Sequence, residues 1–302
     1  MTHVLLAITD PAKPCLSTDL LDSLATHLPQ AATARILSPG EAAEIAFTPP
    51  HPHGLSVLRK LSDGLRQRYA ALPIDFAILP HADRRKHLLL ADMDSTMIRQ
   101  ECIDELAAEL GLKSHVAAIT ERAMRGKIPF EEALRERVAL LAGLPITTID
   151  KILAERIEVM PGSTTLIATM RAHGAYTALV SGGFTLFTGP ISVLLGFNEH
   201  RSNDLQHADG ELTGTVAEPI LGAEAKRVAL EELAKSLPCE LSQTMAVGDG
   251  ANDLPMLEAA GLGIAFHAKP KVAELAKVRI DHGDLTALLY LQGYRMDEFI
   301  SA

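Results

Sequence analysis

Four aspartates stand out because of where they lie along the chain. Asp92 and Asp94 follow a short apolar run, and Asp249 and Asp253 follow another, at residues 244–247. Residues two apart on an extended strand point the same way, so Asp92 and Asp94 are expected to converge on one ligand. Carboxylate oxygens are the hard ligands that Mg²⁺ prefers, and a bound cation relieves the repulsion between them. The pattern predicts a metal-assisted reaction.

Each acidic segment has a plainer interpretation when taken alone. An Asp-x-Asp sequence is common on exposed surfaces, and Asp249-Gly250 is equally typical of a tight turn. The glycines beside Asp249 also let the backbone approach a ligand closely. Two acidic loops, each directly after an apolar run, favour one shared site over two unrelated turns.

Phosphate binding is indicated by Ser181-Gly182-Gly183, which follows the apolar run at 176–180. A hydroxyl and unobstructed N–H groups, at what we expect to be the N-terminus of a helix, are a common way of holding phosphate oxygens. A plain strand-to-helix turn is the simpler explanation of the tripeptide by itself. Lys226, on its own, is typical of a solvated surface lysine.

The elements that must position these residues alternate along the chain. Apolar runs, each followed by a polar or glycine-rich turn, lie at residues 88–91, 176–180, 244–247 and 264–266, with helical patterns between them. Buried parallel strands have this pattern, so we expect an α/β fold with a doubly wound parallel sheet. Ligands of such sheets bind beyond the carboxyl ends of the strands, where the acidic residues lie.

Two insertions between the elements of this core are predicted. The first is a helical cap at about 99–160, with expected helices at 102–110, 116–125, 130–141 and 147–157. The second is a β-hairpin flap at 204–216, because Asp209-Gly210 lies between alternating residues. A cap of this kind is expected to exclude water when it closes.

Residues 1–80 have a different order of expected strands and helices. Expected strands at 3–8, 34–37, 44–47 and 74–79 and a helix at 55–72 give the element order of a small α+β, ferredoxin-like split βαβ sandwich. This order resembles ACT-like regulatory domains, and equally suits a domain that only stabilises or dimerises the protein. The polar segment 81–86 predicts a linker to a second domain at 81–302, with Arg84, Arg85 and Lys86 solvated.

Composition bounds the function further. The 302 residues, 47% hydrophobic and 22% charged, suit a soluble two-domain protein. A formal charge of -10 argues against nucleic-acid or anionic-membrane partners, which need a cationic surface. The three scattered cysteines and the His51/His53 pair predict neither a disulfide framework nor a structural metal site. Without a basic leader or an apolar stretch of about 20 residues, a cytoplasmic location is expected.

The ordered motifs resemble the haloacid dehalogenase superfamily of phosphatases. They are DMDST at 92–96, SGG at 181–183, Lys226 and GDGAND at 248–253. Within that superfamily, residues from about 86 to 295 resemble the phosphoserine phosphatases, in stretches such as LLADMDSTMIRQECIDELA, DGELTGTV and AVGDGANDLPMLEAAGLGIAFHAKP. The resemblance covers about two-thirds of the chain and implies hydrolysis of phosphoserine, the last step of serine biosynthesis.

The resemblance also implies a role for each motif residue. Asp92 would be the nucleophile that forms an aspartyl phosphate, and Asp94 would protonate the departing oxygen and then take a proton from water. Mg²⁺ would be held by Asp92, the carbonyl of Asp94 and Asp249, close to Lys226. Ser181 and Gly182 would bind the phosphate, and Asn252 and Asp253 would orient the ligands and Lys226.

Substrate selection is expected in the cap. The resemblance places Glu101 against the substrate ammonium group and Arg137 on its carboxylate, which a guanidinium binds in bidentate fashion. Met124 and Phe130 match apolar walls of the pocket. Without the resemblance, Glu101 and Arg137 are typical surface residues of amphipathic helices, and Met124 and Phe130 are ordinary core residues.

Two alternatives stay open. The same chemistry would serve another small phosphomonoester, or would transfer phosphate to another alcohol. A different class of function is amino-acid sensing, in which residues 1–80 bind L-serine or another ligand and catalysis is secondary. A homodimer is a possible assembly.

Overall fold

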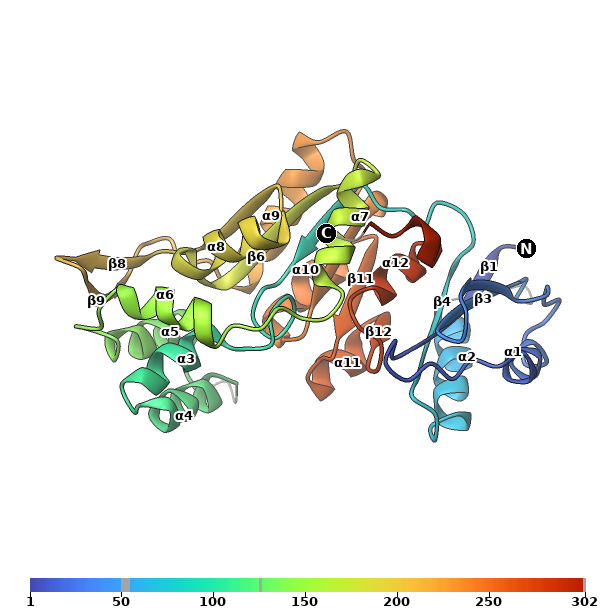
Figure 1. Ribbon diagram of the computed structural model, residues 1–302, viewed down its shortest axis with the longest axis horizontal. Coiled ribbons are helices and arrows are strands. Elements are labelled where there is room, and N and C mark those ends of the chain that lie inside the picture. The colour runs from blue at the N-terminus through green and yellow to red at the C-terminus, as the bar shows by residue number, and fades with distance from the viewer. Residues whose placement is uncertain (50–54, 125–126, 301–302) are drawn as a thin grey trace.

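The computed structural model describes residues 1–49, 55–124 and 127–300, although the side chains of Leu55, Ser56 and Met124 lie outside that description. Three parts lie in a row (Figure 1): an antiparallel-sheet domain at one end, a parallel-sheet core in the middle, and a group of helices at the other end. The described residues form no helix that is long and apolar enough to cross a membrane.

The N-terminal domain has the predicted element order. Its elements are β1 (His3–Thr9), α1 (Thr18–Ala25), β2 (Arg35–Ser38), β3 (Ala42–Phe47), α2 (Leu55–Arg68) and β4 (Ile74–Pro80). The strands form an antiparallel sheet in the order β2-β3-β1-β4. Helix α2 ends at Arg68, four residues before the predicted end, and Pro73 disfavours helical backbone at Leu72.

Both faces of this sheet are buried, which explains why β1 is apolar along its length. Leu5 and Ala7 pack under the helices of the N-terminal domain, and Val4, Leu6 and Ile8 face the central core. Successive residues of a strand point to opposite faces, so one strand contributes to two apolar layers. The N-terminal domain is therefore packed against the core through its sheet.

The core is the predicted doubly wound sheet. Its six strands are β5 (Leu88–Ala91), β6 (Tyr176–Phe184), β7 (Glu199–Asn203), β10 (Thr244–Gly248), β11 (Leu262–Phe266) and β12 (Val278–Ile280). All neighbours are parallel, in the order β12-β11-β10-β5-β6-β7. The predicted strands are confirmed. The edge strands β7 and β12 were not predicted, because β7 is polar and β12 has three residues.

Helices cover both faces of the core sheet. Leu88 and Leu90 face a layer that includes α9 (Ala223–Ser236), α10 (Leu254–Ala259) and α11 (Pro270–Leu275). Leu89 and Ala91 face the opposite layer, with α7 (Ser163–Ala172), α8 (Thr185–Leu195) and α12 (Ala287–Leu291). Each fully buried leucine contributes about 2 kcal/mol to folding, so these layers hold the strand ends in place.

The predicted helical cap and hairpin are both present. The cap contains α3 (Cys102–Glu109), α4 (Lys113–Met124), α5 (Phe130–Ala139) and α6 (Thr147–Glu155), and the hairpin is β8 (Leu205–Ala208) and β9 (Glu211–Val216). Short 3₁₀ turns occur at η1 (Leu241–Gln243), η2 (Ala251–Asp253) and η3 (Met296–Glu298). The two chain segments that enter and leave the cap are hydrogen-bonded, with Met160 N donating to Met97 O at 2.9 Å. The hairpin lies against the cap (Figure 1), where Gly143 N donates to Leu212 O at 2.8 Å.

One residue of the linker cluster, Arg84, differs from the prediction. Arg84 is not solvated, because its side chain is 9% exposed and its Nη2 lies 2.7 Å from Oε2 of the buried Glu44. The guanidinium of Arg85 lies 4.0 Å from the ring centroid of Tyr294. The N-terminal sheet packs on the core, and the linker residues lie between them and become part of that interface.

Candidate active site

The two acidic loops meet at the carboxyl ends of β5 and β10. These strands are neighbours in parallel register, with Ala91 beside Val247, and Asp92 N donates to Val247 O at 3.0 Å. One carboxylate oxygen from each of Asp92, Asp249 and Asp253 lies within 4.8 Å of the others, and all three residues are buried. The predicted convergence of the loops is observed, at the point where connections leave the sheet in opposite directions.

Lys226 is the cation of this cluster and is fully buried. Its Nζ lies 2.6 Å from Asp92 Oδ1 and 2.7 Å from Asp253 Oδ1. Burial alone lowers the pKa of the ammonium, but the charges of Asp253 and Asp92 outweigh it and raise that pKa, so Lys226 stays charged. A solvated surface lysine is therefore excluded.

Asp253 is bound on both oxygens. Its Oδ1 pairs with Lys226, and its Oδ2 accepts a hydrogen bond from Gly250 N at 2.9 Å. Burial and then the charge of Asp253 raise the pKa of Asp92, while Lys226 lowers it. Asp253 thus orients Lys226 and the loop. Asp92 and Asp249 can each bind a ligand through the carboxylate oxygen that no lysine contacts.

The segment after Asp92 turns and does not continue as the expected extended strand. Met97 N and Ile98 N both donate to Met93 O, at 2.9 and 3.1 Å, and Ser95 has a φ of 56°. Asp94 is still brought to the site from this turn. A methyl group at Gly183 would lie 3.2 Å from Asp94 Oδ2, so the carboxyl group is next to the glycine loop.

The Asp94 carboxyl group is suited to carrying a proton. Burial and the nearby charge of Glu101 raise its pKa to about 7, against lowering by Cys102 and Lys226. Its Oδ1 is buried and has no hydrogen-bond partner among the described residues. A buried carboxyl oxygen without a partner is costly unless a ligand binds it.

The Ser181-Gly182-Gly183 segment lies between a strand and a helix, as predicted, although the strand is longer than expected. Strand β6 continues to Phe184, the N-cap residue of α8, so the tripeptide lies just before the first turn of the helix. The pairing of β6 with β7 shifts register between Val180 and Phe184, which marks a bulge. Within the bulge, Gly183 N donates to Ser181 Oγ at 2.9 Å.

Asn203, on edge strand β7, fastens this loop, and sequence reasoning missed it. Its Nδ2 donates to Gly182 O at 2.9 Å and to Leu221 O at 3.2 Å, and its Oδ1 accepts from Leu221 N at 2.6 Å. Asn203 thereby joins the glycine loop to the segment that precedes Lys226. A single polar residue in a polar strand carries no signal in the sequence.

The cap brings three predicted substrate-binding residues, Glu101, Phe130 and Arg137, toward Asp94 and Gly182. Glu101 accepts a hydrogen bond from Ser95 Oγ at 2.9 Å, and the ring of Phe130 would lie 3.5 Å from a methyl group at Gly182. Arg137 is held in the cap by Ala133 O and Thr120 Oγ1, at 3.2 and 3.3 Å. Burial lowers the pKa of Arg137, and the charges of Glu101, Asp104 and Asp94 oppose that, so these carboxylates are close to it.

Two other predicted residues have different outcomes. Asn252 is half-buried and its Oδ1 lies close above Gly250, in the loop that positions Asp253. The Met124 side chain lies outside the described residues, so its predicted place in the pocket wall stays a prediction.

Lys269 is a second site cation, and sequence reasoning did not single it out. Its Nζ lies 3.3 Å from Asp249 Oδ2 and 3.9 Å from Glu101 Oε1. The residue follows β11, the next strand of the sheet. The strand-end rule that indicated the aspartates therefore also points to Lys269, in the stretch HAKP.

The donor set fits a divalent cation. Hard carboxylate oxygens of Asp92 and Asp249 lie together in the buried cluster. Burial, followed by the charges of Asp253 and Glu101, raises the pKa of Asp249 to about 6, although Lys269 lowers it. This excess of negative charge favours a bound cation.

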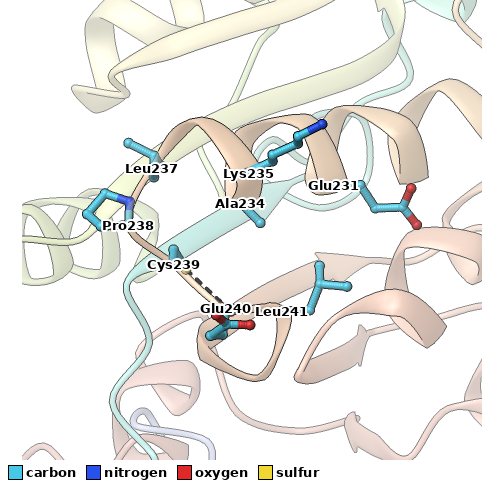
Figure 2. Close-up of a pocket in the computed structure, with 8 residues that line it drawn as sticks. All are labelled: Glu231, Ala234, Lys235, Leu237, Pro238, Cys239, Glu240 and Leu241. Atoms are coloured by element: carbon cyan, nitrogen blue, oxygen red, sulfur yellow. Dashed lines mark hydrogen bonds between the residues drawn. The ribbon is translucent and has the colours of Figure 1, made fainter.

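A hollow of about 450 Å³ lies elsewhere, between the end of α9 and the loop that follows it (Figure 2). Leu237, Pro238 and Cys239 form part of its wall, and the Cys239 thiol donates to Glu240 O at 3.5 Å. None of Asp92, Asp249 and Lys226 lines it. We assign no chemistry to this hollow.

The fold and the site together define a doubly wound α/β protein with an acidic, cation-compatible centre at adjacent strand ends. The model of the haloacid dehalogenase-like hydrolase family matches residues 89–258. The chain belongs to this family.

Three similar proteins extend the comparison. A phosphoserine phosphatase of Mycobacterium tuberculosis is 47% identical over 219 residues, which cover 72% of this chain and 53% of that protein. The chain thus spans about half the length of this curated relative. The structure of a phospho-aspartyl intermediate analogue of phosphoserine phosphatase is 43% identical, with a TM-score of 0.64 over 68% of this chain and 98% of the other. A haloacid dehalogenase family hydrolase from Salmonella enterica serovar Typhi has a TM-score of 0.85 and 31% identity, over 96% of this chain and 98% of the other.

Proposed function

We propose that the protein hydrolyses O-phospho-L-serine to L-serine and phosphate through an aspartyl-phosphate intermediate. The observation that carries this proposal is the meeting of Asp92 with Asp249 and the buried Lys226 at one edge of the sheet. The relatives named as phosphoserine phosphatases support the choice of substrate.

In the first half-reaction, a carboxylate oxygen of Asp92 attacks phosphorus and the bond from phosphorus to the seryl oxygen breaks. The Lys226 ammonium and Met93 N, both on Asp92 Oδ1 at 2.6 and 2.8 Å, fix the orientation of the nucleophile. Asp94 gives its proton to the departing seryl oxygen, a task suited to a carboxyl group with a pKa of about 7.

In the second half-reaction, water attacks the phosphorus of the aspartyl phosphate. Asp94, now ionised, takes the proton of that water, and the bond between phosphorus and the Asp92 oxygen breaks. Inorganic phosphate leaves, and Asp92 and Asp94 return to their starting protonation states.

We also propose Mg²⁺ as the cofactor, held by Asp92, Asp249 and the Asp94 carbonyl oxygen. When bound, it supplies positive charge that offsets the repulsion between an anionic nucleophile and a phosphate dianion. The choice of Mg²⁺ over other divalent ions rests on the oxygen-only donor set.

Binding roles are proposed for the surrounding residues. Ser181 and Gly182 hold the phosphate, Asn252 orients the bound substrate, and Asp253 orients Lys226. Glu101 binds the substrate ammonium group and Arg137 its carboxylate, with Phe130 and Met124 as apolar walls. The Glu101 and Arg137 side chains, both half-buried, support this division of roles.

We propose two domains, with residues 81–302 as the phosphatase domain of a cytoplasmic enzyme. Residues 1–80 are proposed to form an ACT-like domain that binds L-serine as an effector and pairs in a homodimer. Calorimetric titration of Arg137→Ala with L-serine distinguishes an effector site from product binding, because Arg137 is the proposed partner of the serine carboxylate in the active site. Retained binding of L-serine supports a second serine site, and loss of binding contradicts it.

A substrate panel tests the main proposal. Turnover of L-phosphoserine, phosphothreonine, phosphoethanolamine and glycerol phosphate is measured with Mg²⁺ and with a chelator. We expect phosphoserine to be preferred and every rate to depend on the metal. Equal rates on esters that lack a carboxylate would favour another small phosphomonoester as the substrate.

A further inference from the structure

Lys269 contacts the carboxylates of Asp249 and Glu101. In the proposed function, Asp249 binds the divalent cation and Glu101 binds the substrate ammonium group. The Lys269 Nζ lies 3.3 Å from Asp249 Oδ2 and 3.9 Å from Glu101 Oε1. Asp249 belongs to the acidic cluster of the core, and Glu101 is at the N-cap position of α3, the first helix of the cap. One ammonium group therefore spans the metal side and the substrate side of the site.

The backbone around Lys269 is well anchored, so these contacts are built into the fold. Lys269 N donates to Asp249 O at 3.1 Å, and Pro270 begins α11 immediately afterwards. On the other side, His267 stacks on Phe266, and its N donates to Ile280 O at 2.8 Å. The Lys269 side chain is nevertheless 46% exposed, which lets the ammonium move into water at low cost.

We propose that Lys269 is a positioning residue that competes for the two carboxylates, with a divalent cation at Asp249 and with the substrate ammonium at Glu101. A cation on Asp249 must displace or repel the ammonium 3.3 Å away. The same holds for an ammonium group that binds Glu101. The second half of this inference rests on the proposed hydrolysis of phosphoserine, and the first half rests only on the proposed divalent-cation site.

Competition with Lys269 lowers the affinity of Asp249 for a divalent cation and of Glu101 for an ammonium group. Removing the Lys269 charge leaves Asp249 and Glu101 without that partner, so an incoming cation binds more tightly. An exposed ion pair changes affinity by about threefold to fivefold, which sets the size of the effect. A residue that only held the loop in shape would produce the opposite result, because its loss would misplace Asp249.

Mg²⁺ titration calorimetry on the full chain, without substrate, tests the first half. We expect Lys269→Met to bind Mg²⁺ about threefold to fivefold more tightly than the wild type, and Lys269→Arg to match the wild type. Lys271→Met is the matched control, because Lys271 is exposed two residues further on and its loss changes the net charge equally. Unchanged or weaker binding by Lys269→Met overturns the proposal, as does equal tightening by Lys271→Met.

Steady-state kinetics test the second half. We expect Lys269→Met to lower the KM for phosphoserine, which carries an ammonium group, more than the KM for glycerol phosphate, with kcat changed less than KM. Equal KM changes for the two substrates contradict competition at Glu101. If the wild type does not turn over phosphoserine at all, the proposed function fails, while the Mg²⁺ titration still decides the competition at Asp249.

Discussion

A substitution at Asp92 can remove the proposed nucleophile without destabilising the fold. The Asp92 carboxylate is buried and paired with Lys226, yet Lys226 has a second partner in Asp253. Loss of the Asp92 charge therefore does not leave the lysine alone. An amide in its place has nearly the same shape, but it is a far weaker nucleophile.

We accordingly expect Asp92→Asn to abolish phosphate release and to leave the melting temperature close to that of the wild type. Phosphate release and thermal unfolding followed by circular dichroism measure the two effects. Asp63→Asn, at an exposed helix position, is the control for an amide replacement without chemistry. Retained turnover would remove Asp92 as the nucleophile.

Lys226 is the opposite case, because its removal affects the fold itself. The side chain is 0% exposed and pairs with two carboxylates, so Lys226→Met leaves uncompensated charge in the interior. Breaking a buried pair by removing one partner costs about 3–5 kcal/mol. We expect a loss of that size in the free energy of unfolding in urea.

Lys235→Met, on an exposed position of the same helix, is the matched control and should change stability little. Adding Asp253→Asn to Lys226→Met removes one of the stranded charges and should recover part of the loss. Equal stability of the Lys226→Met and Lys235→Met variants would show that the carboxylates are solvated.

At the scale of elements, the flap and the cap form one unit. Strand β9 is hydrogen-bonded to the segment between α5 and α6, and Ile146 N donates to Gly210 O at 2.9 Å. Gly214 has a φ of 79°, and a methyl group there would lie 2.9 Å from Ala142 Cβ and 3.3 Å from Ala139 O. The hairpin can approach the cap this closely only with glycine at 214.

Gly214→Ala should therefore weaken the contact between flap and cap, and Gly210→Ala separates this effect from backbone strain. Gly210 has a similar φ of 84°, but a methyl group there meets nothing within 4 Å. An alanine in the left-handed region lowers the free energy of unfolding by about 1–2 kcal/mol at either position. Overpacking against the cap lowers it by about 1–3 kcal/mol more at position 214 only. Urea unfolding and hydrogen exchange at residues 139–146 measure the difference, and equal losses would show that the contact is loose.

At the scale of the whole molecule, Asp75 connects the N-terminal domain to the core. The buried carboxylate accepts backbone hydrogen bonds from Asp281, His282 and Gly283, at 2.8, 3.0 and 2.8 Å. The same loop continues to Leu285, whose N donates to Pro161 O at 3.1 Å, where the chain leaves the cap. The N-terminal domain and the cap lie at opposite ends of the core (Figure 1), and this loop lies between them.

Asp75→Ala leaves three backbone donors without their acceptor, at a cost of about 3 kcal/mol or more. We expect faster hydrogen exchange at residues 281–286 and a smaller increase at 157–163, together with a lower melting temperature. Asp63→Ala, in the same domain but exposed, is the control. Unchanged exchange at 281–286 would mean that the interface is held by the apolar faces alone.

The sequence by itself determined the order of elements and the positions of the acidic and glycine loops. The runs at 88–91 and 244–247 are apolar because the central strands of a parallel sheet are buried on both faces, and that requirement is visible residue by residue. The convergence of Asp92 with Asp249 followed from the same pattern, since ligand sites lie at the carboxyl ends of such strands.

Only the tertiary structure decided which polar residues are buried and what they bind. Arg84 and Lys226 look like surface cations in the sequence, and each is enclosed by an acidic partner far away in the chain. The bulge at Gly182 depends in the same way on Asn203 across the sheet, and the role of Lys269 depends on the approach of Glu101 from the cap. Burial and pairing are properties of contacts between distant segments, so local pattern does not encode them.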